Sequence, residues 1–280
     1  MLLGLQTHAP NRAEDHEALL NDLPQRWERL GDLVLLPRSA FASPTWKQAF
    51  SASEQRPWAA VAAALRAERL GQQAFIAPDV IRSSNATMLL GASGEVEVTD
   101  HGVCFHFDVT RQMYSSGNVT ERHRMGGLDL RGETVVDAFS GIGYYTLPML
   151  VRGGAKHVHA CDINPDAAAW LLKGAQANGV VGRLTQHVGD NRTTLPALRG
   201  VADRVVLGLL PTSEHAWEHA VGCLKPGGGW LHVHMNVEEE HIETWAEKTA
   251  ARLGGSVGHV ERVKWYAPRI RHVVLDVHVS

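Results

Sequence analysis

The chain has 280 residues, 44% of them hydrophobic and 20% charged, and its formal net charge is −3 at pH 7. This length allows one large or two small domains with a substantial core, and the charge argues against a protein coated in basic residues for nucleic-acid binding, although it allows a local basic patch. No apolar run approaches the roughly 20 residues that span a bilayer, and the N-terminus lacks the basic lead of a signal peptide. The three cysteines are far apart, without a C-x-x-C pair, which is typical of a reducing compartment. We therefore expect a cytoplasmic location.

The first part of the chain predicts a polar segment over residues 1–22 and a small α+β domain over residues 23–112. Residues 31–37 predict a strand that ends at proline, and residues 59–70, rich in alanine, leucine and arginine, predict a helix. Three short strands with turn residues between them follow, and their spacing predicts an antiparallel sheet. These strands are expected at residues 87–91, 94–98 and 102–108.

The second expected domain, residues 113–280, has a regular alternation of strands and helices from Thr134 onward. Such alternation predicts a parallel sheet covered on both faces. The last two strands lie too close in sequence for a helical crossover and should form an antiparallel hairpin. An α/β fold with a seven-stranded sheet that ends in an antiparallel hairpin resembles the class I, Rossmann-like fold of S-adenosylmethionine-dependent methyltransferases. The seven strands are expected at residues 134–139, 157–162, 184–189, 203–209, 229–236, 257–266 and 272–279.

A glycine loop follows the first strand of this sheet. The strand ends in Asp137, and Gly141 and Gly143 then allow unusual backbone angles and close approach of a ligand to the main chain. Nineteen residues after Gly143, the second strand ends in Asp162, a spacing that suits a carboxylate accepting hydrogen bonds from a ribose. The third glycine of the dinucleotide fingerprint is missing, which favours a mononucleoside such as S-adenosylmethionine. The alternatives are a plain glycine turn and an aspartate that caps the next helix.

Two further segments predict ligand contacts. Asp190 and Asn191 close the third strand and could bind an adenine amino group and ring nitrogens, or form an ordinary turn. The polar segment 113–124 contains a Ser-Gly-Asn turn and is typical of a binding loop. Within it, Arg122 could pair with a carboxylate in bidentate geometry. The alternative for this segment is the start of a surface helix.

Three features near the C-terminus have weaker signals. Residues 208–211 stand where amino-group methyltransferases of similar fold carry an Asn-Pro-Pro-Tyr-like motif, and the missing asparagine argues against methylation of an exocyclic amine. His232 and His234 share one strand face, and residues 238–241 add three glutamates and a histidine nearby. Their spacing fits no established zinc motif, so we expect packed histidines and no metal. Residues 261–272 mix basic and aromatic side chains, which suits either RNA contacts or a solvated hairpin tip.

Taken together, several of these segments closely resemble the tRNA wybutosine-synthesising protein 2 family of aminocarboxypropyl transferases, which is related to the tRNA guanosine-37 N1-methyltransferases. Residues 23–32 and 107–110 resemble the family's small middle domain. The segments that carry the main resemblance are residues 113–122, 137–148, 189–192 and 204–211.

The resemblance implies a reaction in which the 3-amino-3-carboxypropyl group of S-adenosylmethionine moves to C7 of 4-demethylwyosine at position 37 of tRNA(Phe), with release of methylthioadenosine. It implies no metal and no covalent nucleophile. A general base could help remove the ring proton; Tyr114, Glu121 and His123 are candidates, so the catalytic residue stays open. Carried over by motif, the cofactor contacts would come from Ser115, Arg122, Asp162, Asp190 and Asn191. The glycine loop is expected to add contacts from Asp137, Gly141 and Gly143.

The chain departs from the family in two places. Many relatives have glutamate where this chain has Asp162, which shortens the reach by one methylene. We also expect no counterpart here of an additional N-terminal region found in some relatives, and hence weaker independent tRNA affinity. One alternative function is a tRNA N1-guanosine methyltransferase, against which Gly208 counts. Another is a non-catalytic nucleoside- or RNA-binding subunit, which the intact set of Gly141, Gly143, Asp162 and Asp190 disfavours.

Overall fold

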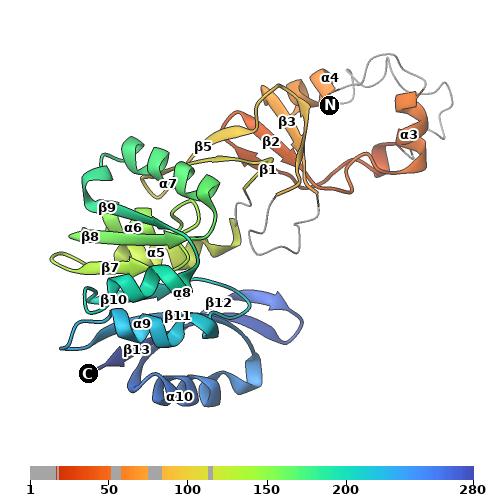
Figure 1. Cartoon of the computed structure of the whole chain (residues 1–280). Coiled ribbons are helices and arrows are strands. Elements are labelled where there is room, and N and C mark those ends of the chain that lie inside the picture. The colour runs from red at the N-terminus through yellow and green to blue at the C-terminus, as the bar shows by residue number, and fades with distance from the viewer. Residues whose placement is uncertain (1–16, 18, 52–57, 75–83, 113–115) are drawn as a thin grey trace. The chain divides into compact units, whose positions relative to one another are not determined.

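The computed structural model describes residues 17, 19–51, 58–74, 84–112 and 116–280 (Figure 1). The chain forms two compact units. The first contains Met1–Val98 and His106–Tyr114, and the second contains Thr99–Phe105 and Ser115–Ser280. No helix in the described ranges is long and apolar enough to cross a membrane.

The first unit is built on a four-stranded sheet of order β1-β2-β3-β4. Strands β2 and β3 are parallel, whereas β1 pairs with β2 and β4 pairs with β3 in antiparallel fashion. The antiparallel sheet expected from residues 87–91, 94–98 and 102–108 does not form as one sheet, since only the first of these strands joins this sheet. Its parallel pair arises because two helices between β2 and β3 return the chain to the same end of the sheet. The elements are β1 (Glu28–Leu30), β2 (Leu33–Leu36), α3 (Pro44–Ser51), α4 (Trp58–Ala64), β3 (Arg69–Gln72) and β4 (Thr87–Leu90).

The helix expected over residues 59–70 is shorter than predicted. Helix α4 ends at Ala64, and Arg66 turns the chain with a φ of 51°. The following residues then pair in β3, where Leu70 is fully buried in the apolar core of the unit. Burial in a sheet thus overrides the helical propensity of the alanine- and leucine-rich run.

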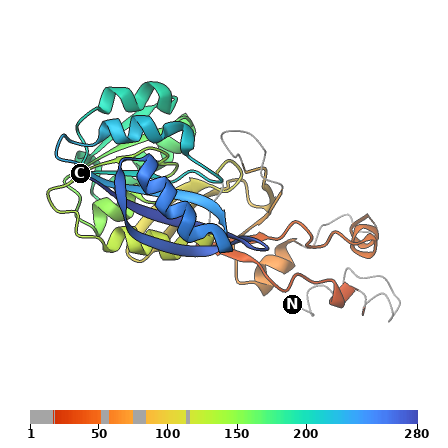
Figure 2. The ribbon, with the colours of Figure 1, turned by 90° about the horizontal axis from the view of Figure 1, so that it is seen from below.

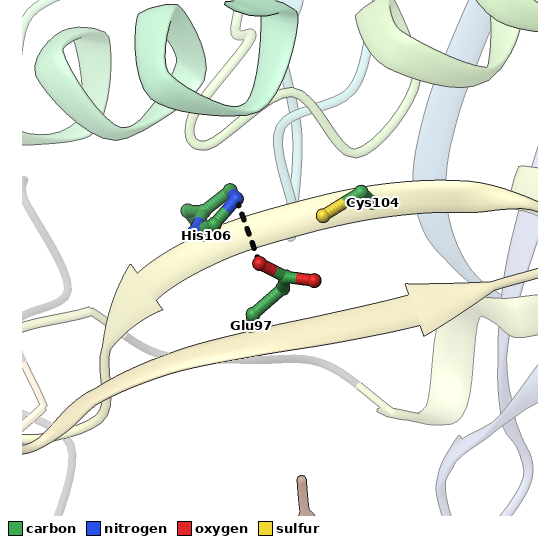
Figure 3. Close-up of side chains that lie close together, drawn as sticks. All are labelled: Glu97, Cys104 and His106. Carbon is green, nitrogen blue, oxygen red and sulfur yellow. Dashed lines mark ion pairs between the residues drawn. The ribbon is translucent and has the colours of Figure 1, made fainter. Parts of the chain in front are cut away.

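A separate two-stranded sheet joins β5 (Glu95–Asp100) and β6 (Val103–Asp108). Its turn residues His101 and Gly102 both have positive φ, 51° and 78°, as expected for a two-residue hairpin turn that matches the strand twist. Glu97 and His106 form an ion pair of 3.4 Å across the hairpin (Figure 3).

The second unit contains the predicted seven-stranded sheet, of order β12-β13-β11-β10-β7-β8-β9. Its pairs are parallel except those of β13, which runs antiparallel to both β11 and β12, so the predicted fold class and final hairpin are confirmed. The strands are β7 (Thr134–Asp137), β8 (His157–Asp162), β9 (Leu184–Val188), β10 (Arg204–Leu207), β11 (Gly229–Glu238), β12 (Gly255–Ala267) and β13 (Ile270–Val279).

Helices cover both faces of this sheet (Figures 1 and 2). Neighbouring residues of one strand serve opposite faces: Val135 packs in the core with α5, α6 and α7, while Val136 packs in the core with α9 and α10. The α-helices are α5 (Val119–Gly127), α6 (Thr146–Val151), α7 (Pro165–Ala177), α8 (Asn191–Thr194), α9 (Trp217–Cys223) and α10 (Ile242–Arg252). The 3-10 helices are η1 (Ser116–Asn118), η2 (Val181–Arg183), η3 (Leu195–Leu198), η4 (Glu214–Ala216) and η5 (Glu239–His241).

The strand order positions a binding edge. Strand β7 has β8 on one side and β10 on the other, so the chain reverses its direction of travel across the sheet at β7. Ligands of open α/β sheets bind outside the carboxyl ends of the strands at such a reversal. The loops after β7, β8, β9 and β10 meet at this edge.

Candidate active site

The glycine loop after β7 has the predicted backbone. Gly141 and Gly143 have φ values of 52° and 95°, in the left-handed region that favours glycine. The space around them differs. A Cβ on Gly141 would make ordinary contact with the Tyr144 ring at 3.7 Å, whereas a Cβ on Gly143 would lie 2.6 Å from Leu171 and 2.8 Å from Leu147. The missing side chain of Gly143 thus makes room for two core leucines.

Replacing Gly143 with alanine is expected to lower the free energy of unfolding by about 2 kcal/mol, from the overlap with the leucines and the strained φ together. Gly179 is a matched control, because it has a φ of 67° but a Cβ added there would meet no atom within 4 Å. Gly179→Ala should cost about 1 kcal/mol. Urea denaturation of both variants measures the difference, and equal losses would contradict the packing role.

Asp162 and Gly141 meet at the carboxyl ends of neighbouring strands. The Gly141 N–H donates to Asp162 Oδ2 at 2.7 Å, and the Asn164 N–H donates to Oδ1 at 2.9 Å. Burial raises the pKa of Asp162, against the effect of these N–H groups. The cap of α7 is Asn164, which accepts from the Asp166 N–H at 3.0 Å. Asp162 therefore does not serve as the helix cap, and each of its oxygens keeps a further lone pair for a ligand hydroxyl.

Asp137 stabilises the glycine loop after β7 through buried hydrogen bonds. It is fully buried, accepts from the Thr146 hydroxyl at 2.7 Å and lies 3.3 Å from the Phe139 N–H. These bonds join the end of β7 to the first residue of α6. The sequence predicts a cofactor contact at Asp137; in the structure its carboxylate is held by Thr146 beneath the glycine loop, where it positions that loop.

Burial raises the pKa of Asp137 from its usual 3.8 to about 6. The folded state then holds this proton more tightly than the unfolded state, so the contribution to stability is full below about pH 4 and is lost as the pH rises through about 6. Between pH 4 and pH 7, the free energy of unfolding of the wild type should fall by about 2 to 3 kcal/mol more than that of Asp137→Asn. Urea denaturation of both proteins across this pH range measures the difference. The same pH dependence of the free energy of unfolding in both would refute a raised pKa of Asp137.

The residues after β9 belong to the same edge. Asp190 caps α8 through the Arg192 N–H at 2.8 Å and pairs with the Arg192 guanidinium at 2.5 Å, and this hydrogen bonding lowers the pKa of Asp190 to about 2. Asn191 is buried, and its Nδ2 donates to the Ala138 carbonyl at 2.5 Å. Asp190 is thus both a cap and a charged group at the edge, and Asn191 ties this loop to the glycine loop.

Arg122 lies against the glycine loop. It belongs to α5 and is 1% exposed, with its guanidinium 5.7 Å from the Phe105 ring and 5.8 Å from the Tyr144 ring. Its Nε donates to Asp100 at 2.9 Å. Helix α5 does begin in this segment, with Thr120 exposed, but the neighbouring Glu121 is also fully buried, so the alternative of a surface helix start holds for the first residues only. Asp100 is twenty-two residues away on the hairpin, and no sequence signal pointed to it.

The candidate general bases differ in surroundings. Tyr114 lies outside the described residues, as does the expected cofactor contact Ser115. His123 is partly exposed, and its Nε2 lies 2.8 Å from Asp100. Glu121 accepts from Arg124 at 2.7 and 2.9 Å, and its burial raises its pKa to about 7. Both described candidates are therefore bound to protein partners, and the catalytic base stays unassigned.

His232 and His234 do not face a common metal position. His232 Nδ1 lies 2.6 Å from Asp276, and the Arg204 guanidinium donates to its Nε2 at 2.8 Å. His234 Nδ1 lies 3.1 Å from His272 Nε2. Each ring is directed to its own partner in the sheet, which agrees with the expectation of packed histidines. Sequence reasoning missed these partners because they lie on other strands.

A largely buried network of ion pairs and hydrogen bonds includes His232. Glu121 accepts from Arg124, which donates to Asp276 at 2.6 and 3.0 Å. Asp276 accepts from His232, and Arg204 beyond it pairs with Glu133 at 2.8 Å. These ion pairs and hydrogen bonds thereby join α5 to β13, β11 and β10 and hold in place the helix that carries Arg122.

The glycine loop, the acid one strand away and the mostly parallel seven-stranded sheet with its antiparallel end define a class I, Rossmann-like transferase of the S-adenosylmethionine-dependent kind. Within this class, the chain belongs to the TRM5/TYW2 methyltransferase family, whose domain model matches residues 96–254. The model of the TYW2 N-terminal domain matches residues 12–94.

Three relatives illustrate the similarity. A tRNA wybutosine-synthesizing protein 2/3/4 of Arabidopsis thaliana is 46% identical over 272 residues, covering 93% of this chain but 27% of the plant protein. A tRNA wybutosine-synthesizing protein 2 homolog of Danio rerio is 42% identical over 303 residues, covering 93% of this chain and 73% of the fish protein. The crystal structure of Pyrococcus horikoshii TYW2 in complex with MeSAdo matches with a TM-score of 0.77 and 28% identity, covering 98% of this chain and 96% of that one. The chain thus spans about a quarter of the plant relative's length.

Proposed function

We propose that this protein transfers the 3-amino-3-carboxypropyl group of S-adenosylmethionine to C7 of 4-demethylwyosine at position 37 of tRNA(Phe), in wybutosine biosynthesis. The names of the plant and fish relatives support this pathway. The archaeal relative binds MeSAdo, the methylthioadenosine that remains when S-adenosylmethionine loses its aminocarboxypropyl arm. Methyl transfer would leave S-adenosylhomocysteine instead.

The packing at Gly208, directly after β10, is the observation in this chain that favours aminocarboxypropyl transfer over methyl transfer. A Cβ at this position would lie 3.0 and 3.3 Å from two ring carbons of Tyr145. Glycine thus lets the Tyr145 ring occupy the place next to β10. An asparagine that grips an amine, as in amino-group methyltransferases of similar fold, would require this ring to move.

In the proposed complex, S-adenosylmethionine lies outside the carboxyl ends of β7, β8 and β9. Asp162 accepts hydrogen bonds from the ribose, the adenine lies beside Asp190 and the backbone of Asn191, and Gly141 allows close approach of the main chain. Arg122 supplies positive charge for the carboxylate of the arm. Asp137 and Gly143 shape the loop without touching the ligand.

The chemistry requires orientation more than a reactive side chain. The sulfonium has three carbons open to attack, and the carbon placed in line with the nucleophile reacts. C7 of the base bonds to the arm carbon that is attached to sulfur, and the bond between this carbon and sulfur breaks with its electron pair going to sulfur. The C7 proton then leaves. Holding the arm rather than the methyl group toward the base selects the product.

Mass spectrometry of nucleosides tests this function, with tRNA carrying 4-demethylwyosine, S-adenosylmethionine and the protein. A gain of an aminocarboxypropyl group with release of methylthioadenosine is expected. A gain of a methyl group with release of S-adenosylhomocysteine would assign methyl transfer instead. No product despite cofactor binding would favour a non-catalytic subunit.

The anticodon loop of tRNA(Phe) is the proposed partner, in agreement with the tRNA-modifying relatives. We also infer a cytoplasmic location, because Cys104, Cys161 and Cys223 form no disulfide with one another, as is usual for cysteines in reducing compartments.

A further inference from the structure

The outer half of β11 presents a row of polar side chains on one sheet face. His232, His234 and Asn236 alternate with apolar residues, so all three point to the same side. His272 of β13 stands directly opposite Asn236 in the strand register. The row runs from the middle of the sheet to its carboxyl edge.

The two ends of this row differ in hydrogen bonding. At the inner end, both ring nitrogens of His232 have protein partners. At the outer end, four buried atoms meet no partner among the described residues, namely Asn236 Nδ2, Asn236 Oδ1, His234 Nε2 and His272 Nδ1. Buried polar atoms are nearly always paired, and leaving them unpaired costs stability. Each such group in a native structure calls for an explanation, and a ligand that pairs with these atoms when it binds is one.

The imidazole pair offers both a donor and an acceptor. Burial lowers the pKa of both rings, that of His272 to about 4, so both are neutral. One ring donates to the other across the 3.1 Å contact. Each neutral ring carries one proton, so one of the two outward nitrogens is an N–H donor and the other is an acceptor. If both rings adopt the other neutral tautomer, these roles are exchanged.

The row adjoins the glycine loop. The Tyr145 ring, which follows that loop, lies 5.0 Å from the His234 ring and fills the space beside Gly208. The Asn236 N–H donates to the Pro211 carbonyl at 3.0 Å. The unpaired atoms therefore lie at the same sheet edge as the loops after β7 and β10.

We propose that the side-chain amide of Asn236 and the His234–His272 pair form the acceptor pocket, where they hydrogen-bond the edge of the tRNA base that receives the transferred group. An amide presents an acceptor beside a donor in one plane, and it pairs with a base edge that offers a donor beside an acceptor. Purine-derived bases have such edges, and bases taken out of their stack are recognised there. This assignment rests on the proposed function.

The test combines stability, cofactor binding and base recognition in Asn236→Ala. The thermal midpoint and the affinity for S-adenosylmethionine should stay at wild-type level or rise, because the variant removes an unpaired buried amide. The value of kcat/KM on tRNA carrying the target base should fall by about tenfold or more. His272→Gln should also lower it, whereas His278→Gln, on the same strand but exposed at the opposite end, should not.

A binding measurement separates this pocket from the chemistry. Anticodon stem-loops with the target base or with an abasic position 37 are titrated into protein saturated with S-adenosylmethionine. The wild type should prefer the base by about tenfold or more, and Asn236→Ala should lose that preference. If the wild type shows the preference but transfers nothing, the pocket stands and the proposed function fails. Equal affinities of the wild type for both stem-loops, or unchanged preference and kcat/KM in Asn236→Ala, would overturn the pocket.

Discussion

Asp276→Asn is expected to lower the free energy of unfolding by about 3 to 5 kcal/mol at pH 7, the range for breaking a buried ion pair from one side. Asp276 is 6% exposed and accepts hydrogen bonds from Arg124 and His232. Without its charge, the Arg124 guanidinium keeps Glu121 as its counter-ion inside the protein but loses the second carboxylate. Urea denaturation followed by circular dichroism measures the loss.

The pH dependence of this loss gives a second readout. Burial alone would raise the pKa of Asp276, but His232 and Arg124 hold it far below its usual 3.8. A lowered folded-state pKa means that the stabilisation is present above about pH 4 and is lost as the pH falls below that value. The difference between Asp276→Asn and the wild type should therefore shrink in acid.

Asp129→Asn is the matched control. Asp129 also pairs with an arginine, Arg131 at 2.6 Å, but both side chains are exposed. Solvent and salt screen such pairs, so the denaturation midpoint should not change measurably. A loss equal to that of Asp276→Asn would show that burial does not determine the effect.

Asp162→Ala is expected to weaken S-adenosylmethionine binding by about a hundredfold or more, as two hydrogen bonds to a charged acceptor are lost. The substitution removes the proposed ribose acceptor and also frees the Gly141 N–H that Asp162 holds at 2.7 Å. Isothermal titration calorimetry measures the affinity directly. It needs no tRNA, so it tests the cofactor site independently of the transfer reaction.

Asp162→Glu is the control for this substitution. Glutamate keeps the charge and adds one methylene, so the affinity should stay within about tenfold of the wild type. Wild-type affinity in Asp162→Ala would show that the ribose lies elsewhere. An equal loss in both variants would mean that the side-chain length, rather than the charge, is decisive.

Local patterns were sufficient to predict most of the second unit. The strand that ends at Asp137, the glycines after it and the acid at the end of β8 all follow from period, spacing and backbone chemistry within a few residues. The helix expected over residues 59–70 ends early, at Ala64, because non-local pairing of Leu70 with β2 and β4 outweighed local propensity. The expected antiparallel sheet is divided between two sheets, since β4 pairs with β3 instead of with β5.

The fold class and the glycine loop follow from the amino-acid order alone, since both depend on neighbours along the chain. Which polar residues are buried together depends instead on how the elements pack. Arg122 meets Asp100, Arg124 meets Asp276, and Gly208 makes room for Tyr145. These contacts join residues from different strands and helices, and the cost of burying a charge or the space for a ring depends on that packing. The proposed acceptor pocket at Asn236 likewise became visible only when its unpaired atoms were placed in three dimensions.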